Sequence, residues 1–222
     1  MPITGGNWQM KELHLPTKAR LTSDLVPDLA LTHGQTLWVL ESMGFSAGIP
    51  TSTFNHYIKS LRKLGTPFAY GKANTGGGRL AHYSYNHLME LCLALSLRVY
   101  GAIPDRILVG IIEFREELYA LYRRAYIEFA TGLGASIRVT AKGRTEFEMS
   151  GVYLDLRIRF GGGRALEFGP PRAVSPFEAL RAYARLDTPG RAHLPFNLST
   201  LAIDLVECAE AAPDIHRGPH KE

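Results

Sequence analysis

The stretch from Thr36 to Ser84, TLWVLESMGFSAGIPTSTFNHYIKSLRKLGTPFAYGKANTGGGRLAHYS, decides the fold of the first half of this chain. A short helical segment meets a turn at Gly44, and a second helix is predicted over residues 51–64. A glycine-rich basic loop follows at residues 71–79. Two helices and a basic loop in this order are typical of a winged helix-turn-helix that reads duplex DNA.

The second predicted helix has one apolar and one polar face. Phe54, Ile58, Leu61 and Leu64 recur at helical spacing and should point into the core. Short polar side chains near the start of the other face suit base edges, and basic side chains further along suit phosphates. The alternative is an ordinary solvated face. The residues we expect to contact DNA are Ser52, Thr53, Asn55, His56, Lys59, Arg62 and Lys63.

The loop at residues 71–79 is predicted to be a wing laid on the DNA backbone or minor groove. Lys72 and Arg79 would contact phosphates there. The loop lacks the Gly-Lys-Ser/Thr ending of a nucleotide-binding P-loop, and no buried parallel strand precedes it. The alternative that remains is a flexible surface hairpin.

The positive charge of the chain is concentrated around this module. The 222 residues carry a net charge of +4, and residues 51–100 alone carry +5, because six basic residues there face one acid, Glu90. A basic module on a nearly neutral body favours a polyanionic partner, and double-stranded DNA fits best.

Catalytic and metal-binding motifs are missing from the sequence. Cys92 and Cys208 have no Cys or His at ligand spacing, so we expect buried thiols in a reducing compartment. Of the eight histidines, only His216 and His220 have helical ligand spacing, and Pro219 lies between them. No apolar run reaches the roughly 18 residues of a membrane span. We therefore expect a cytoplasmic protein that has no enzymatic activity, binds no metal or cofactor and does not associate with a membrane.

Outward from the central stretch, a helix is predicted from Ser84 to Val99 and a long helix from Pro104 to Thr131. The long helix carries an apolar heptad seam, which predicts a dimerisation helix; the alternative is packing inside one subunit. The seam residues are Ile107, Ile111, Phe114, Leu118, Leu121 and Ala125.

Beyond Gly134 the apolar period changes to two, which predicts a four-strand antiparallel meander reaching Phe168. Ser175-Pro176-Phe177-Glu178 has the pattern of a capping box and predicts a helix over residues 175–186. A final helix is predicted over residues 197–211. The fold class is therefore α+β: a winged helix-turn-helix, a long dimerisation helix, and an antiparallel meander with covering helices.

This pattern divides the chain into four parts. Residues 1–33 form an N-terminal arm, extended or with a short helix near residues 23–31. Residues 34–103 form the winged-helix domain, residues 104–132 the linking dimerisation helix, and residues 133–222 a C-terminal α+β domain.

In the order of its parts, the chain resembles the MerR family of bacterial transcription regulators over residues 36–131. That family has a helix-turn-helix, a wing that ends in a Tyr-Ser-like step, and a second helix pair broken by a glycine-containing turn before a long dimerisation helix. The resemblance implies that Thr51–Lys59 is the recognition helix and Lys72–Arg79 the wing. It also implies that Tyr83-Ser84 leads into the second helix pair and that Gly101–Ile107 forms its turn.

The sequence thus favours a homodimeric, sequence-specific DNA-binding transcription regulator acting on a roughly palindromic site. One alternative is an architectural or recombination accessory protein that resembles excisionases. Another is a winged helix that binds only proteins. The residues leave open whether the C-terminal half binds a ligand, a second subunit or RNA polymerase.

Overall fold

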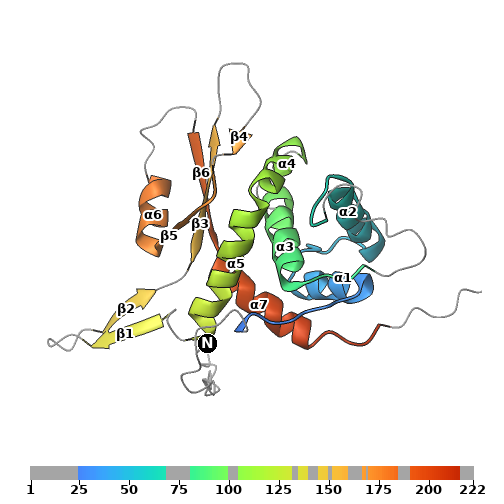
Figure 1. Ribbon diagram of the computed structural model, residues 1–222, viewed down its shortest axis with the longest axis horizontal. Coiled ribbons are helices and arrows are strands. Elements are labelled where there is room, and N and C mark those ends of the chain that lie inside the picture. The colour runs from blue at the N-terminus through green and yellow to red at the C-terminus, as the bar shows by residue number, and fades with distance from the viewer. Residues whose placement is uncertain are drawn as a thin grey trace, which may run out of the picture.

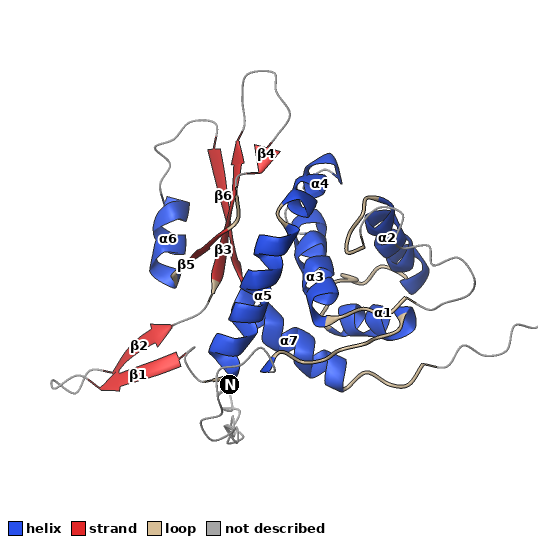
Figure 2. Ribbon diagram, in the orientation of Figure 1, coloured by secondary structure: helices blue, strands red, loops and turns tan. Residues whose placement is uncertain are grey.

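A computed structural model describes residues 25–68, 81–99, 105–131, 135–139, 145–149, 152–159, 167–168, 170–184 and 191–215. The fold is α+β. A body of helices lies beside a small antiparallel sheet that carries one helix on its far side (Figures 1 and 2). Most buried apolar residues of both parts belong to a single cluster that runs from Leu31 to Ala209, and Val174 and Ala179 lie outside it.

The first two helices are α1 (His33–Ser42) and α2 (Thr51–Lys63). Thr32 and Gln35 form a capping box that fixes the start of α1. The connection at residues 43–50 includes Gly44 and Gly48 at positive φ, where the absence of a Cβ lets the chain turn without strain. It is longer than the three to four residues of a compact helix-turn-helix.

Helix α3 (Tyr85–Val99) lies at the centre of the helical body. Its residues 88–95 and Leu97 are all buried, so the helix is covered on every side along most of its length. Helix α2 lies against it, and Arg98 stacks over the Tyr57 ring at 4.9 Å and donates to the Ser60 hydroxyl at 2.6 Å. These contacts fix α2 on the core.

The long helix predicted over residues 104–131 is two helices, α4 (Asp105–Glu113) and α5 (Arg115–Ala130), and the prediction of one continuous helix was wrong. The break is at Phe114, directly before Arg115. Arg115 pairs with the buried Glu90 of α3, so the first residue of α5 is held by a tertiary contact that a heptad pattern does not register.

The predicted four-strand meander is wrong at its centre: its first and last pairings occur, but its second and third strands do not pair among the described residues. Strands β1 (Ala135–Val139) and β2 (Thr145–Met149) pair only with each other among the described residues. Strand β3 (Tyr153–Arg159) instead pairs along its whole length with β6 (Arg191–Asn197). The other edge of β3 is taken by β4 and β5, whose bounds are Glu167–Phe168 and Arg172–Val174. Both edges of β3 are therefore occupied, and β2 has no place beside it.

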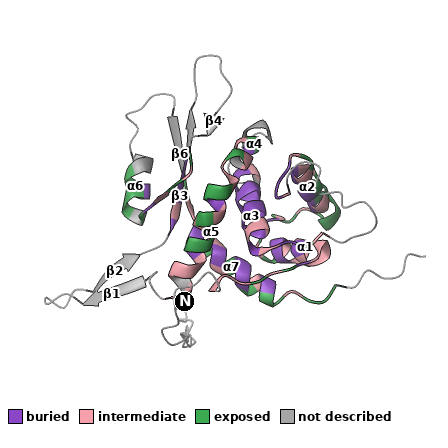
Figure 3. Cartoon of the chain, in the orientation of Figure 1, coloured by how far each residue is buried: buried purple, intermediate pink, exposed green. Residues whose placement is uncertain are grey.

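Helix α6 (Pro176–Ala184) confirms the predicted capping box. The Ser175 hydroxyl accepts from the Glu178 N–H at 3.2 Å, and the Glu178 carboxylate accepts from the Ser175 N–H at 3.0 Å. The helix covers the sheet through Ala179 and exposes Phe177 and Leu180. Figure 3 shows this exposed outer face.

Helix α7 (Leu198–Glu210) packs against α1, α3 and α5. Asn197 caps it by accepting from the Thr200 N–H, which matches the predicted start of this helix. The Ser199 hydroxyl accepts from the Val152 N–H at 3.0 Å and donates to the Ala125 carbonyl at 3.4 Å, joining the sheet to α5. Although the sequence division assigned α7 to residues 133–222, it completes the core of the N-terminal helices.

Candidate nucleic-acid interface

Helix α2 lies at the edge of the helical body with one face in the core (Figure 1). Phe54, Ile58 and Leu61 are fully buried, as the sequence predicts. Most polar residues selected from the sequence lie on the outer side. Five of them are exposed: Ser52, Thr53, His56, Lys59 and Lys63.

The exposed face of α2 suits a polyanion for two reasons. Residues 51–63 contain three cations and no acid. The start of the helix has no side-chain cap: Pro50 occupies the N-cap position and makes no side-chain hydrogen bond. Residues 51–53 are exposed, so the positive end of the helix dipole is open to solvent, as it is where helices bind phosphate.

Arg62 is placed differently from the two lysines. It is half-buried, and its guanidinium lies 5.7 Å from the centre of the Phe68 ring. Arg62 therefore packs partly within the chain, which the two lysines do not. Burial raises the pKa of Tyr83, while the nearby charge of Arg62 opposes that rise.

Asn55 is also half-buried and joined to the first helix. Its Oδ1 lies 3.0 Å from Nε2 of His33, the first residue of α1. The other ring nitrogen of His33, Nδ1, lies 3.2 Å from the Tyr83 hydroxyl. Sequence reasoning missed both partners, because His33 stands in a helix start and Tyr83 beyond a long loop, without any local pattern that links them to Asn55.

The predicted wing, with Lys72 and Arg79, lies outside the described residues. Its two flanks are described, and they meet. Leu31 and Tyr83 form an antiparallel β-bridge through two backbone hydrogen bonds of 2.8 and 3.1 Å. The Phe68 and Tyr83 rings lie 5.0 Å apart. The chain therefore leaves α2 and returns to it beside the segment that precedes α1.

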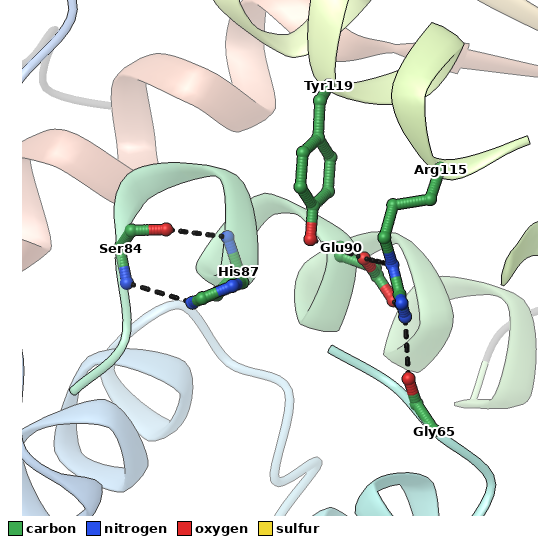
Figure 4. A network of polar contacts seen from close by, with 6 residues as sticks. All are labelled: Gly65, Ser84, His87, Glu90, Arg115 and Tyr119. Carbon is green, nitrogen blue, oxygen red and sulfur yellow. Dashed lines mark hydrogen bonds and ion pairs between the residues drawn. The ribbon is translucent and has the colours of Figure 1, made fainter. Parts of the chain in front are cut away.

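A buried polar network contacts Gly65, directly after the end of α2 (Figure 4). Arg115 donates to the Glu90 carboxylate at 2.7 and 2.9 Å and to the Gly65 carbonyl at 2.6 Å. The Tyr119 hydroxyl donates to the same carboxylate at 2.9 Å. Burial raises the pKa of Glu90, although the hydrogen bonds from Arg115 and Tyr119 oppose the rise. The network ties α2, α3 and α5 together.

His87 lies next to this network at the start of α3. Its Nδ1 accepts from the Ser84 N–H at 3.3 Å, and its own N–H donates to the Ser84 hydroxyl at 3.4 Å. Its ring packs edge-on against Phe68 at 4.8 Å. Burial lowers the pKa of His87, and the charge of Arg115 lowers it further. The neutral ring is therefore a structural part of the helix start.

The predicted dimerisation seam is divided between the inside and the surface of a single chain. Leu118 and Ala125 are fully buried against the chain's own helices. Phe114 and Leu121 are half-buried, and the side chains of Ile107 and Ile111 lie outside the described residues. For Leu118 and Ala125, the burial therefore agrees with the alternative to a dimer interface, which was packing within one subunit.

Among the described residues, no group of three or more acidic, histidine or cysteine side chains could hold a metal ion. Cys92 is buried with its sulfur 3.9 Å from that of Met43, and burial strongly raises the pKa of its thiol. No helix in the described part of the chain has both the length and the apolar character needed to cross a membrane.

Comparison of the chain with protein-family models gave no match, and comparison with curated proteins and with solved structures gave none either.

Proposed function

We propose that this protein is a sequence-specific DNA-binding transcription regulator that inserts α2 into the major groove, in the manner of a MerR-like winged helix. The observation that carries the proposal is the outer face of α2. It combines the short polar Ser52 and Thr53 near an uncapped helix start with Lys59 and Lys63 further along. Short side chains reach base edges there, and the lysines contact the flanking phosphates.

The surroundings of α2 support the same function. The helix is fixed to α3 by Arg98, and its end at Gly65 is fixed by Arg115. Because α2 is held rigidly by these contacts, its base-contacting side chains stay in register with the groove. This favours sequence-specific binding over non-specific electrostatic binding. Phe68 and Tyr83, which stand before and after the expected wing in the sequence, lie with their rings 5.0 Å apart, so the two ends of that segment lie close together.

A homodimer is part of this proposal, because two copies of α2 spaced by a helical turn of DNA would read a roughly palindromic site. The buried Leu118 and Ala125 are not available for its interface. Phe114 and Leu121, the more exposed residues of the seam, would form a dimer interface only together with other surface residues around them.

Selection from a pool of random duplexes tests the proposal. The protein should enrich a specific sequence with dyad symmetry, and Lys59→Glu combined with Lys63→Glu should abolish the enrichment. Arg181→Glu on the exposed surface of α6 is a matched control and should leave it unchanged. If the protein enriches no sequence, or if the α2 variant binds as well as the parent protein, the proposal is wrong.

A further inference from the structure

The hydrogen bonds that join Tyr83, His33 and Asn55 have a direction. The amide oxygen of Asn55 can only accept, so Nε2 of His33 donates to Oδ1 across 3.0 Å. A neutral imidazole with its proton at Nε2 accepts at Nδ1, so the Tyr83 hydroxyl, 3.2 Å away, donates to that nitrogen.

We infer that His33 is a positioning residue that fixes the Asn55 amide with its oxygen turned inward and its NH₂ group turned outward, so that the recognition helix presents a donor to DNA at this position. The inference rests on the proposed function and assigns the kind of base edge that the site reads. This arrangement differs from the bidentate pair of asparagine with adenine, which uses both ends of the amide.

The consequence for base choice follows from the groove chemistry. In the major groove guanine offers the acceptors N7 and O6, and thymine offers O4. Adenine and cytosine each place an exocyclic amino donor there, which needs the amide oxygen as its partner. Adenine also offers the acceptor N7, but beside its amino donor, whereas guanine offers two acceptors side by side. With the amide oxygen held by His33, the outward NH₂ group therefore favours guanine or thymine over adenine, and disfavours cytosine most.

Two different helices contribute to this arrangement. Asn55 belongs to α2, His33 to α1, and Tyr83 follows the expected wing. A free asparagine amide can turn by 180° and thereby exchange its donor and acceptor at small cost. An amide held by a hydrogen bond cannot make this exchange. The helix then distinguishes base edges that a rotating amide would accept equally.

The protonation of His33 gives a test that needs no DNA. Long-range ¹H–¹⁵N correlation spectra of the intact protein, recorded above the pH at which the ring protonates, identify the imidazole tautomer. The spectrum of His33→Gln assigns the His33 signals. We expect the Nε2–H tautomer, and its signal should shift in Asn55→Ala. A dominant Nδ1–H tautomer would mean that the amide is turned the other way, and it would overturn the inference.

Selection from random duplexes tests the base choice. The parent protein should enrich guanine or thymine opposite Asn55, a position identified as the one whose preference disappears in Asn55→Ala. His33→Phe keeps an aromatic ring but has no donor, so the preference should fall by about tenfold and adenine should be admitted. His33→Gln restores a donor and should recover much of the preference.

His82→Ala is the matched control, because His82 is an exposed histidine beside the same β-bridge and its ring hydrogen-bonds the Ala30 carbonyl instead of Asn55. It should leave the preference unchanged. Circular dichroism and thermal melting of each variant separate misfolding from a change in base choice. Adenine or cytosine in the parent selection contradicts the inference while leaving the proposed function intact. A parent protein that selects no sequence contradicts the proposed function, and the tautomer still decides the role of His33.

Discussion

Arg115 contacts both carboxylate oxygens of Glu90 while the same guanidinium holds the carbonyl of Gly65. Glu90 is only 1% exposed, and the Arg115 side chain is 15% exposed. A pair this deep is costly to break on one side, because the remaining charge is left in the core without a partner. The end of α2 therefore depends on an ion pair between two other helices.

Replacing Arg115 by methionine should lower the free energy of unfolding by about 3 kcal/mol at neutral pH. Removal of the guanidinium also raises the pKa of Glu90 beyond the rise that burial already causes. A carboxyl whose pKa is raised in the folded state adds stability below its unfolded pKa, and this is lost as pH rises through the folded pKa. Urea unfolding should therefore show a larger deficit at pH 7 than at pH 4.5.

The double variant Arg115→Met with Glu90→Gln should recover much of that loss, since no buried charge remains. Arg123→Met, at an exposed position on the same helix, is the control and should change little. A deficit independent of pH would show that lost packing, rather than the unpaired carboxyl, is responsible.

The start of α3 should make the fold sensitive to mild acid. Burial depresses the pKa of His87, so the unfolded chain binds its proton more readily than the folded one. The stability that the neutral ring contributes is present above the ordinary histidine pKa of about 6.5 and is lost as pH falls through the folded pKa. Thermal melting between pH 8 and pH 5 measures this loss.

Substitution of His87 by glutamine should flatten that profile. Together with Ser84, glutamine completes a capping box, so the helix start is kept while the titrating ring is removed. His56→Gln, an exposed position on α2, should leave the acid sensitivity in place. Equal acid sensitivity in His87→Gln and the parent protein would assign the effect to another group.

Lys59 and Lys63 should contribute affinity without specificity. Alanine at either position should weaken binding to specific and unrelated duplexes alike and lower the dependence of log K on log salt by about 0.9, the contribution of one phosphate contact. Fluorescence anisotropy titrations at several salt concentrations measure both quantities. Arg181→Ala, which removes a cation on α6 instead of α2, is the control and should change neither quantity. A loss confined to the preferred duplex would assign the lysine to a base contact instead.

Leu118 tests where the apolar seam of α5 packs. Because its side chain is fully buried within one chain, Leu118→Ala should cost about 2–5 kcal/mol in unfolding free energy. The oligomeric state, measured by light scattering during size-exclusion chromatography, should be the same as in the parent protein. A variant that becomes monomeric from a dimer without losing stability would place Leu118 in an interface between subunits.

Local patterns in the sequence were enough to predict most elements of the fold. The spacing of Phe54, Ile58 and Leu61 gives the buried face of α2, and the capping residues Ser175 and Asn197 mark the starts of α6 and α7. These signals depend only on neighbouring residues, and the structure shows the buried face and the helix caps that they indicate.

The contacts between distant segments could not be predicted in this way. The sequence of β6 contains Pro195 and has no clean alternation, so nothing local indicates that it pairs with β3. The pairing of Asn55 with His33 joins two helices across a turn, and it changes which end of the amide is available. At the candidate interface, the exposed residues of α2 follow from periodicity, while Arg62 and Asn55 depend on partners that only the folded chain brings together.

Helix α7 has a consequence for how the protein is made. Its buried Leu205 belongs to the same core as α1 and α3, and Ile215 beyond it lies so near Gly34 that a Cβ there would come within 3.1 Å of its side chain. A ribosome releases α1, α2 and α3 long before it reaches Leu198, so the nascent chain carries an incomplete core through most of its synthesis. Helices α1, α3 and α5 would reach their mature packing only after α7 emerges. On the proposed function, binding to DNA would then wait until translation has passed this helix, and a protein truncated before it would lack a complete core.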